Sequence, residues 1–236
     1  MKPEETMTPS AGTDTGLPSL SRDDDVFVLQ LGAGENLFHP DWLAAVNAAL
    51  DEVEHATGPR ALVTEASGKF YSNGLDLDWL SAHADQHEDY LVTVHRLFAR
   101  VLSMPVITVT AIQGHAFAAG AMFTLSHDFR VMRSDRGFWC LPEVDINIPF
   151  TSGMASLIQA RIPPQAAHEA MLTGHRYGGD AAHNIAIVDH AVSEAKVAST
   201  ARDIAAAHTA KAGETLAAIK ATMYAPALKT LRQATI

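Results

Sequence analysis

The chain has 236 residues, of which 47% are hydrophobic and 19% are charged, a balance typical of a globular protein with a sizeable core. Its 17 basic and 27 acidic residues give a net charge of −10, which argues against nucleic acid or an anionic membrane as partner, since both attract clustered Lys and Arg. The single cysteine, Cys140, cannot form an intrachain disulfide and favours a reducing, cytoplasmic setting.

The first 23 residues are rich in Pro, Ser, Thr and acidic residues, and they lack the apolar core of a secretory signal. No apolar run in the chain is long enough to cross a bilayer. We therefore expect a disordered tail over 1–23. The rest is expected to form a core over 24–192 and a helical C-terminal region over 193–236.

The elements of the core follow from the spacing of apolar residues. In chain order we expect a strand in 26–34, a helix over 41–56, a strand in 60–67, a glycine-bearing loop over 68–80 that turns into a helix, a helix over 86–103, a strand in 105–114, a helix over 119–128, a strand over 129–134 and an extended stretch over 137–150. From Ser152 the pattern is mainly helical. Strands that alternate with helices, followed by a mainly helical region, predict an α/β domain with a helical C-terminal end.

Several reactive patterns are incomplete. In GAGENL, Leu37 replaces the third glycine of a dinucleotide-binding fingerprint, and Ser72 lacks the preceding glycine of a nucleophile elbow. His83 and His87 have the spacing of metal ligands on a helix, but no third ligand is evident, so we expect a solvated polar face and no metal. Cys140 lies among apolar residues and is interpreted as a buried small hydrophobe.

The remaining candidate motifs are three segments, which follow one another along the chain: ALVTEASGKFYSNGLDL, ITVTAIQGHAFAAGAMFTLSHD and GFWCLPEVDINIP. Taken singly, each is compatible with a plain strand-to-helix turn. Together they resemble the crotonase, or enoyl-CoA hydratase/isomerase, superfamily over about residues 25–195. The resemblance implies a ββα spiral core, assembly into trimers or pairs of trimers, and an acyl-CoA thioester as substrate. It implies no cofactor, because CoA is part of the substrate.

The resemblance also implies an oxyanion hole made of the backbone N–H groups of Leu75 and Ala119. A run of small residues there would let a thioester approach the backbone closely, at a point where negative charge develops during the reaction. The residues expected to bind the substrate around it are Lys69, Phe70, Ser72, Asn73, Gly74, Ala118, Gly120 and Met122. Among them, Lys69 is a candidate for the CoA 3′-phosphate.

One carboxylate decides the expected chemistry. Hydratases of this superfamily carry two glutamates; here the second is present as Glu143, and the first maps to Met122, which cannot carry a proton. A single base suffices to take a proton from C2 of a 3-enoyl-CoA and return it at C4. The chain therefore looks most like the Δ3,Δ2-enoyl-CoA isomerase branch, with Glu143 as the acid/base.

Two acidic neighbours have their own expected roles. Asp76 is expected to cap the following helix. If the segment after Glu143 is extended, Asp145 would share its face and could raise its pKa, or could instead pair with an Arg or a backbone donor.

Two alternatives remain open. One is a different crotonase reaction, such as hydration, thioester hydrolysis or decarboxylation; Met122 argues against hydration. The other is an acyl-CoA-binding protein that has the fold without the activity, against which the intact Glu143 argues.

Overall fold

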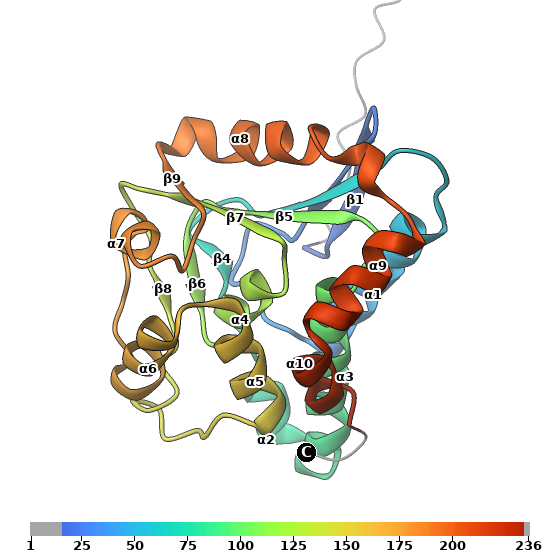
Figure 1. Cartoon of the computed structure of the whole chain (residues 1–236). Helices are drawn as coiled ribbons and strands as arrows, with labels where there is room; N and C mark the ends of the chain where they lie inside the picture. The colour runs from blue at the N-terminus through green and yellow to red at the C-terminus, as the bar shows by residue number, and fades with distance from the viewer. Residues whose placement is uncertain (1–15, 234–236) are drawn as a thin grey trace, which may run out of the picture.

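The computed structural model describes residues 16–233 and contains two sheets (Figure 1). The larger sheet has the order β1-β2-β3-β5-β7-β9, and all its neighbours after the first pair are parallel. Its strands are β1 (Ser19–Asp23), β2 (Val26–Gln30), β3 (Ala61–Glu65), β5 (Ile107–Ile112), β7 (Phe129–Arg133) and β9 (His190–Val192). The smaller parallel sheet consists of β4 (Phe70–Ser72), β6 (His115–Phe117) and β8 (Trp139–Cys140).

The two sheets are built alternately along the chain. Strand β3 of the large sheet is followed by β4 of the small one, β5 by β6, and β7 by β8, and helices return the chain to the large sheet between these pairs. Each turn of the chain therefore adds one strand to each sheet. This is the ββα spiral that was expected, and the fold-class prediction is confirmed.

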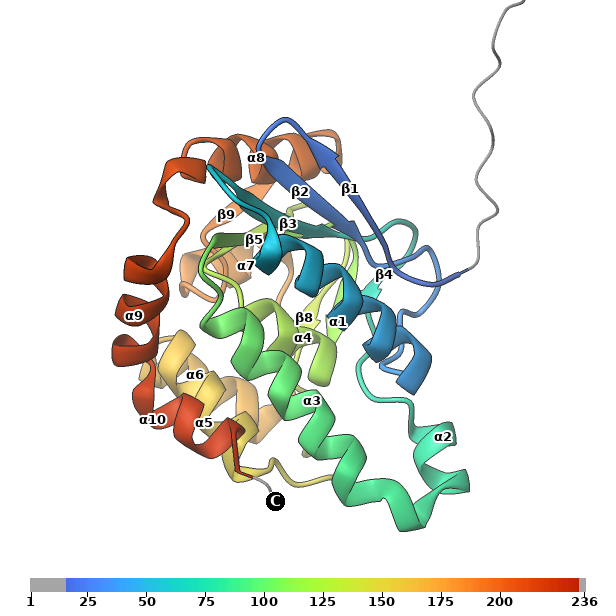
Figure 2. The same ribbon diagram turned by 90° about the vertical axis from the view of Figure 1, so that its right-hand side faces the viewer.

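Helices cover both faces of the large sheet (Figures 1 and 2). They are α1 (Pro40–His55), α2 (Leu77–Ala82), α3 (His87–Leu102), α4 (Ala119–Leu125), α5 (Ser152–Arg161), α6 (Pro164–Thr173), α7 (Gly179–Asn184), α8 (Glu194–Ala206), α9 (Glu214–Met223) and α10 (Ala225–Leu231), with short 3₁₀ turns at Ala84–Gln86 and Thr209–Lys211. None of the helices in 16–233 is long and apolar enough to cross a bilayer.

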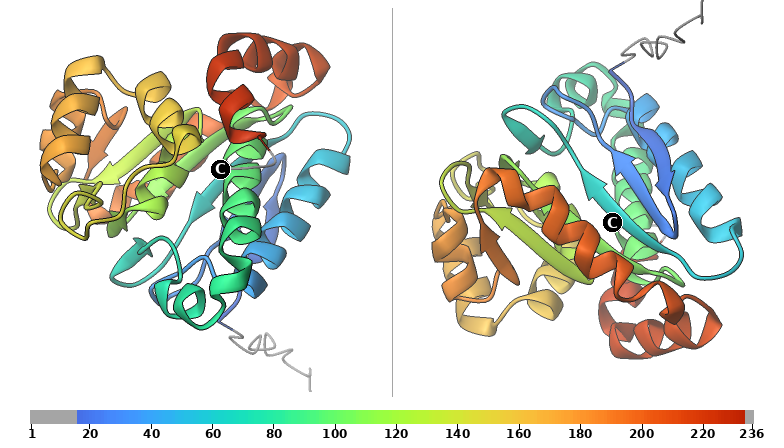
Figure 3. Two further views of the ribbon diagram at one scale, coloured as in Figure 1. Left: turned by 90° about the horizontal axis from the view of Figure 1, so that it is seen from below. Right: turned by 90° about the horizontal axis from the view of Figure 1, so that it is seen from above.

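Two apolar clusters divide the interior. The larger one lies between the two sheets and helices α1, α3, α4 and α5, and the smaller one lies beneath α8. Figure 3 shows α8 crossing the outer face of the large sheet. The segment after residue 193 is thus part of the same packed body, because α8 closes one sheet face and α10 packs against α3 and α5.

The expected tail is wrong over its last residues. Ser19–Asp23 forms an edge strand that pairs antiparallel with β2 through the two-residue turn Asp24–Asp25, in which Asp24 has a φ of 51°. Nearly every side chain of this strand is exposed, so it shows no alternation of apolar and polar residues. The expectation for residues 1–15 lies outside the described part of the chain.

The extended stretch expected over 137–150 is also wrong beyond Cys140. The chain turns after Pro142, whose carbonyl accepts hydrogen bonds from the N–H groups of Asp145 and Ile146. The N–H of Ile148 donates to the carbonyl of Glu143. Residues 143–148 therefore form a compact turn, and neighbouring side chains no longer alternate between two faces.

Candidate active site

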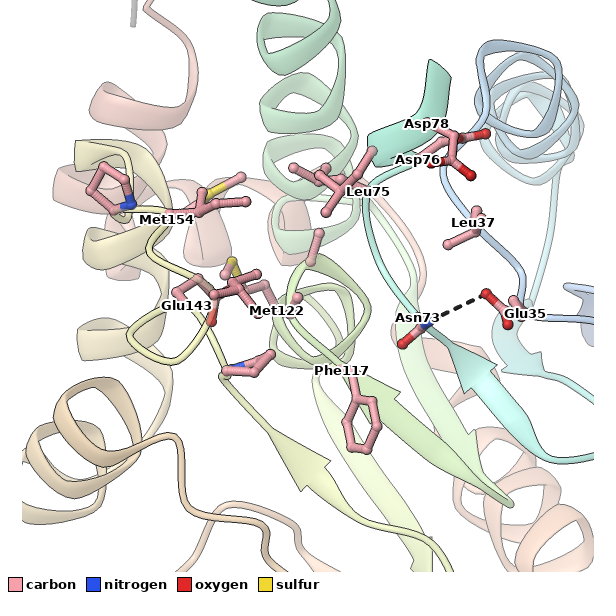
Figure 4. A pocket seen from close by; sticks show the side chains of 17 residues that line it. Glu35, Leu37, Asn73, Leu75, Asp76, Asp78, Phe117, Met122, Glu143 and Met154 are labelled. Atoms are coloured by element: carbon pink, nitrogen blue, oxygen red, sulfur yellow. Dashed lines mark hydrogen bonds between the residues drawn. The ribbon is translucent and has the colours of Figure 1, made fainter. Parts of the chain in front are cut away.

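The three strands of the small sheet run parallel, so their carboxyl ends meet at one edge. There β4 leads to Leu75, β6 leads to Ala119 and β8 leads to Glu143. These residues line one cavity of about 330 Å³ (Figure 4). Its other lining residues are Glu35, Leu37, Asn73, Asp76, Leu77, Asp78, Phe117, Ala118, Met122, Pro142, Ile146, Ile148, Pro149 and Met154.

The turn after β4 is fixed by Ser72 and Gly74. The buried Ser72 hydroxyl donates to the carbonyl of Asn36 at 2.8 Å and accepts from the N–H of Gly74 at 3.1 Å. Gly74 has a φ of 87°, and a Cβ on it would lie 2.9 Å from the nitrogen of Ala119. The turn therefore requires glycine here, and it brings the chain before Leu75 against the start of α4.

The small-residue run lets two backbones touch. A Cβ on Gly120 would lie 2.4 Å from the carbonyl oxygen of Ser72, so α4 packs directly on the end of β4. Ala118, just before the helix, has a φ of 49° and a ψ of −125°, which is rare for a residue with a side chain. Its N–H donates to the carbonyl of Cys140 at 3.0 Å. The strained conformation fixes the peptide that carries the N–H of Ala119.

Two backbone N–H groups at the cavity are available as hydrogen-bond donors. Neither the N–H of Leu75 nor that of Ala119 donates a hydrogen bond to any group in residues 16–233, and both residues line the cavity. Contact between Gly74 and Ala119 holds the two loops together. A pair of fixed, unused N–H groups at a cavity can stabilise an oxyanion.

Glu143 lies in the same cavity, with 6% of its surface exposed. Burial raises the pKa of its carboxyl group to about 7, and its Oε2 has no hydrogen-bond partner among the described residues. In Figure 4 the side chains of Glu143 and Met122 lie close together, with Met154 beyond them. A carboxylate whose pKa lies near neutrality can both accept and return a proton.

Asp145 plays no part in the environment of Glu143. Its carboxylate lies at the end of α6, where a Cβ on Gly174 would come within 2.5 Å of Oδ2. The pKa of Glu143 is raised by burial and not by a neighbouring charge. The condition under which the two acids would share a face, an extended segment, is not met, because the chain turns after Pro142.

Acidic residues form the opposite side of the cavity. Asp76 caps α2 as expected, accepting from the N–H of Trp79 at 2.9 Å, and Asp78 follows it. Glu35 accepts a hydrogen bond from Asn73 at 3.3 Å (Figure 4). Nothing in the incomplete GAGENL motif indicates that Glu35 would reach this cavity.

The substrate-binding residues expected from the sequence separate into three groups. Asn73, Ala118 and Met122 line the cavity. Ser72, Gly74 and Gly120 lie behind it, and the fully buried Ser72 shapes the turn instead of facing the cavity. Lys69 and Phe70 lie away from the cavity, at the other end of β4, where the Lys69 Nζ is 4.8 Å from the centre of the Phe70 ring.

The remaining reactive side chains have structural partners. His83 contacts the carbonyl of Trp79 through Nδ1, and no group of three metal-ligating side chains occurs within 16–233. Cys140 is buried, as expected, and its thiol donates to the carbonyl of Gly174. Burial raises its pKa to about 11, which makes it a poor nucleophile at neutral pH.

Replacing Ala118 with glycine is expected to stabilise the fold. The substitution removes the cost of holding a residue with a side chain at positive φ. This gain exceeds the cost of the greater conformational entropy that glycine gives the unfolded chain, so the free energy of unfolding should rise by about 1 kcal/mol. Urea unfolding measures it. Ala121→Gly in α4 is the control and should lose about 1 kcal/mol. Equal losses in both variants would mean that Ala118 is not strained.

Known proteins resemble this chain in sequence and in fold. A family model described as enoyl-CoA hydratase/isomerase matches residues 23–235. Peroxisomal enoyl-CoA delta isomerase 2 of Arabidopsis thaliana is 34% identical, covering 87% of this chain and 91% of its own, and enoyl-CoA delta isomerase 3 of the same plant is 35% identical, covering 86% and 85%. The crystal structure of a probable enoyl-CoA hydratase from Mycobacterium tuberculosis superposes with a TM-score of 0.84 at 28% identity over 91% of each chain.

Proposed function

This chain belongs to the enoyl-CoA hydratase/isomerase family, and from that we propose that it moves the double bond of a 3-enoyl-CoA to the 2-position. Two relatives named as enoyl-CoA delta isomerases support this reaction. The observation that carries the proposal is the pairing of one buried glutamate with two unused backbone N–H groups in a single cavity.

In the proposed reaction, the thioester oxygen accepts hydrogen bonds from the N–H groups of Leu75 and Ala119. The ionised Glu143 takes a proton from C2, and the electron pair of that C–H bond moves into the thioester, giving an enolate whose oxygen those N–H groups stabilise. Glu143 then returns the proton to C4 as the C3–C4 double bond shifts to C2–C3. Atoms and charge balance without a cofactor.

In this proposal Met122 is the residue that favours isomerisation over hydration. It is 1% exposed and lines the cavity near Glu143, so it supplies an apolar surface where a second carboxylate would be needed to handle water. Met154 adds a second thioether. Flexible thioethers suit the packing of an acyl chain, and they do not position a water molecule.

The rate should depend on pH through Glu143. Only the ionised carboxylate can take the C2 proton, and its pKa is raised to about 7. We therefore expect kcat/KM to rise tenfold per pH unit below about pH 7 and to level off above it. The measurement is a pH profile with 3-hexenoyl-CoA. A profile that is flat down to pH 5 would exclude a base with this pKa.

The direct test uses two substrates. The purified protein should convert 3-hexenoyl-CoA into a conjugated enoyl-CoA, seen as rising absorbance, and should hydrate crotonyl-CoA very poorly, so that its absorbance persists. Efficient hydration of crotonyl-CoA would show that Met122 is no barrier, and the isomerase proposal would fall. The trimeric assembly and the cytoplasmic location stay predictions.

A further inference from the structure

The N–H of Leu75 can bind the thioester oxygen only if the peptide that carries it keeps its orientation. Gly74 comes directly before it at a φ of 87°, and a glycine allows the following peptide to rotate more freely than any other residue does. In the opposite orientation, the carbonyl of Gly74 would take the place of the N–H and repel the developing oxyanion. The proposed reaction therefore needs contacts that hold this peptide in place.

The backbone of Phe38 holds this peptide from one side. The carbonyl of Gly74 accepts a hydrogen bond from the N–H of Phe38 at 2.8 Å. The peptide between Gly74 and Leu75 is trans, so its N–H points away from its carbonyl. The N–H of Leu75 is thereby directed away from Phe38, and its direction depends on where the backbone of Phe38 lies.

Tyr90, in the first turn of α3, connects Phe38 to the other side of Leu75. Its hydroxyl donates to the carbonyl of Phe38 at 2.9 Å and accepts from the N–H of Asp76 at 3.1 Å. One side-chain atom therefore links the segment before α1 to the turn after β4. The two peptides that flank Leu75 are both held, one by the N–H of Phe38 and the other by this hydroxyl. Because the N–H of Asp76 is occupied, the N–H of Leu75 is the donor left unused in the turn.

The hydroxyl of Tyr90 is itself held in place. The residue is 4% exposed, and its ring stacks on that of Trp79 at a centroid distance of 5.3 Å. Burial raises the pKa of the phenol to about 12, so the hydroxyl keeps its proton and can donate at neutral pH. The ring of Phe38 is fully buried and stacks on Trp42 at 4.8 Å. Tyr90 does not line the cavity, so its contacts suit positioning and not proton transfer to the substrate.

We propose that Tyr90 is a positioning residue for the isomerisation and acts through the backbone N–H of Leu75. Its hydroxyl holds the turn from Gly74 to Asp76 against Phe38, so that this N–H meets the thioester oxygen at a fixed angle. The proposal rests on the proposed function, since the oxyanion that the N–H stabilises forms in that reaction. Part of the preorganisation of the oxyanion hole then comes from α3, outside the cavity.

The first experiment compares two variants that each lose one buried hydroxyl and keep the ring. Tyr90→Phe should lower kcat for 3-hexenoyl-CoA about tenfold and change KM less than about twofold, because the oxyanion contact is strongest in the transition state. Tyr71→Phe is the matched control. Tyr71 is fully buried, and its hydroxyl contacts Thr64 of the large sheet at 2.9 Å instead of the turn after β4.

Both variants should lose a similar amount of stability in urea, because each removes a buried hydrogen bond. At a temperature where both are folded, only Tyr90→Phe should lose kcat. An unchanged kcat in Tyr90→Phe, or equal losses of kcat in the two variants, would overturn the proposal, since the hydroxyl would then serve the fold alone.

The second experiment does not depend on turnover. Infrared difference spectra of bound hexanoyl-CoA, labelled with ¹³C at its thioester carbonyl, report the hydrogen bonds to the carbonyl oxygen. The wild type and Tyr71→Phe should lower the stretching frequency of this carbonyl equally, and Tyr90→Phe should lower it less. No lowering in the wild type, or the same lowering in Tyr90→Phe, would overturn the proposal. If the frequencies follow this expectation but the wild type does not isomerise 3-hexenoyl-CoA, the proposed reaction is wrong and the effect of Tyr90 on the N–H of Leu75 stands.

Discussion

Glu143→Gln is expected to lower the rate of 3-enoyl-CoA isomerisation by about 10²–10⁴ while acyl-CoA binding is retained. The amide keeps the size of the side chain in its buried position, but it cannot accept the C2 proton. Steady-state kinetics with 3-hexenoyl-CoA give the rate, and calorimetry with a saturated acyl-CoA gives the affinity. Near-wild-type turnover in this variant would remove Glu143 from the mechanism.

The pH dependence of the free energy of unfolding shows whether this variant loses activity because the base is gone or because the protein is unfolded. Folded Glu143 keeps its proton up to about pH 7, whereas the unfolded group keeps it only up to about 4.5. The folded state therefore binds more protons in this window, and the free energy of unfolding of the wild type falls as pH rises through it, by on the order of 3 kcal/mol. Glu143→Gln lacks this fall, so its stability relative to wild type should rise across the window. Urea unfolding at both ends of the window measures it.

Ala119→Val is expected to lower kcat/KM by about 10²–10³, through both binding and turnover. The added methyl groups would stand at the backbone donor and prevent the thioester from reaching it, while the N–H itself is kept. Ala119 is 1% exposed and Gly74 packs on its nitrogen, so the loop has little room to move aside.

Ala121→Val is the control, because it adds the same atoms to a buried position of α4 that does not line the cavity. It should cost stability without a comparable loss of turnover at temperatures where it is folded. Normal turnover by Ala119→Val would mean that the oxyanion hole lies elsewhere.

The long elements could be predicted because their burial is periodic over several turns. Helix α3 repeats its buried residues over His87–Leu102, and α1 does so over Pro40–His55. Strands β4, β6 and β8 are two or three residues long, too short for alternation to be visible. Strand β1 is exposed along most of its length, so its polar composition indicated a tail instead.

The site could be predicted only in part, for a different reason. Leu75 and Ala119 contribute backbone N–H groups, and almost any residue type can supply such a group. The pair was therefore predicted only from the resemblance to the crotonase superfamily. The turn after Pro142 depends on backbone hydrogen bonds that apolar spacing does not reveal, so the extended stretch expected over 137–150 was wrong beyond Cys140. Glu35 reaches the cavity through the fold of a loop and its contact with Asn73, which no local pattern encodes.

The most direct test of the proposed mechanism follows the proton that Glu143 moves from C2 to C4. If Glu143 alone takes the C2 proton and returns it to C4, some of that hydrogen must stay in the product. Its Oε2 has no partner in residues 16–233 to which the proton could pass. With 3-hexenoyl-CoA carrying two deuterium atoms at C2, single turnover in ordinary water should give 2-hexenoyl-CoA with a measurable fraction of deuterium at C4 by NMR. A product whose new C4 hydrogen comes entirely from solvent would contradict the single-glutamate mechanism.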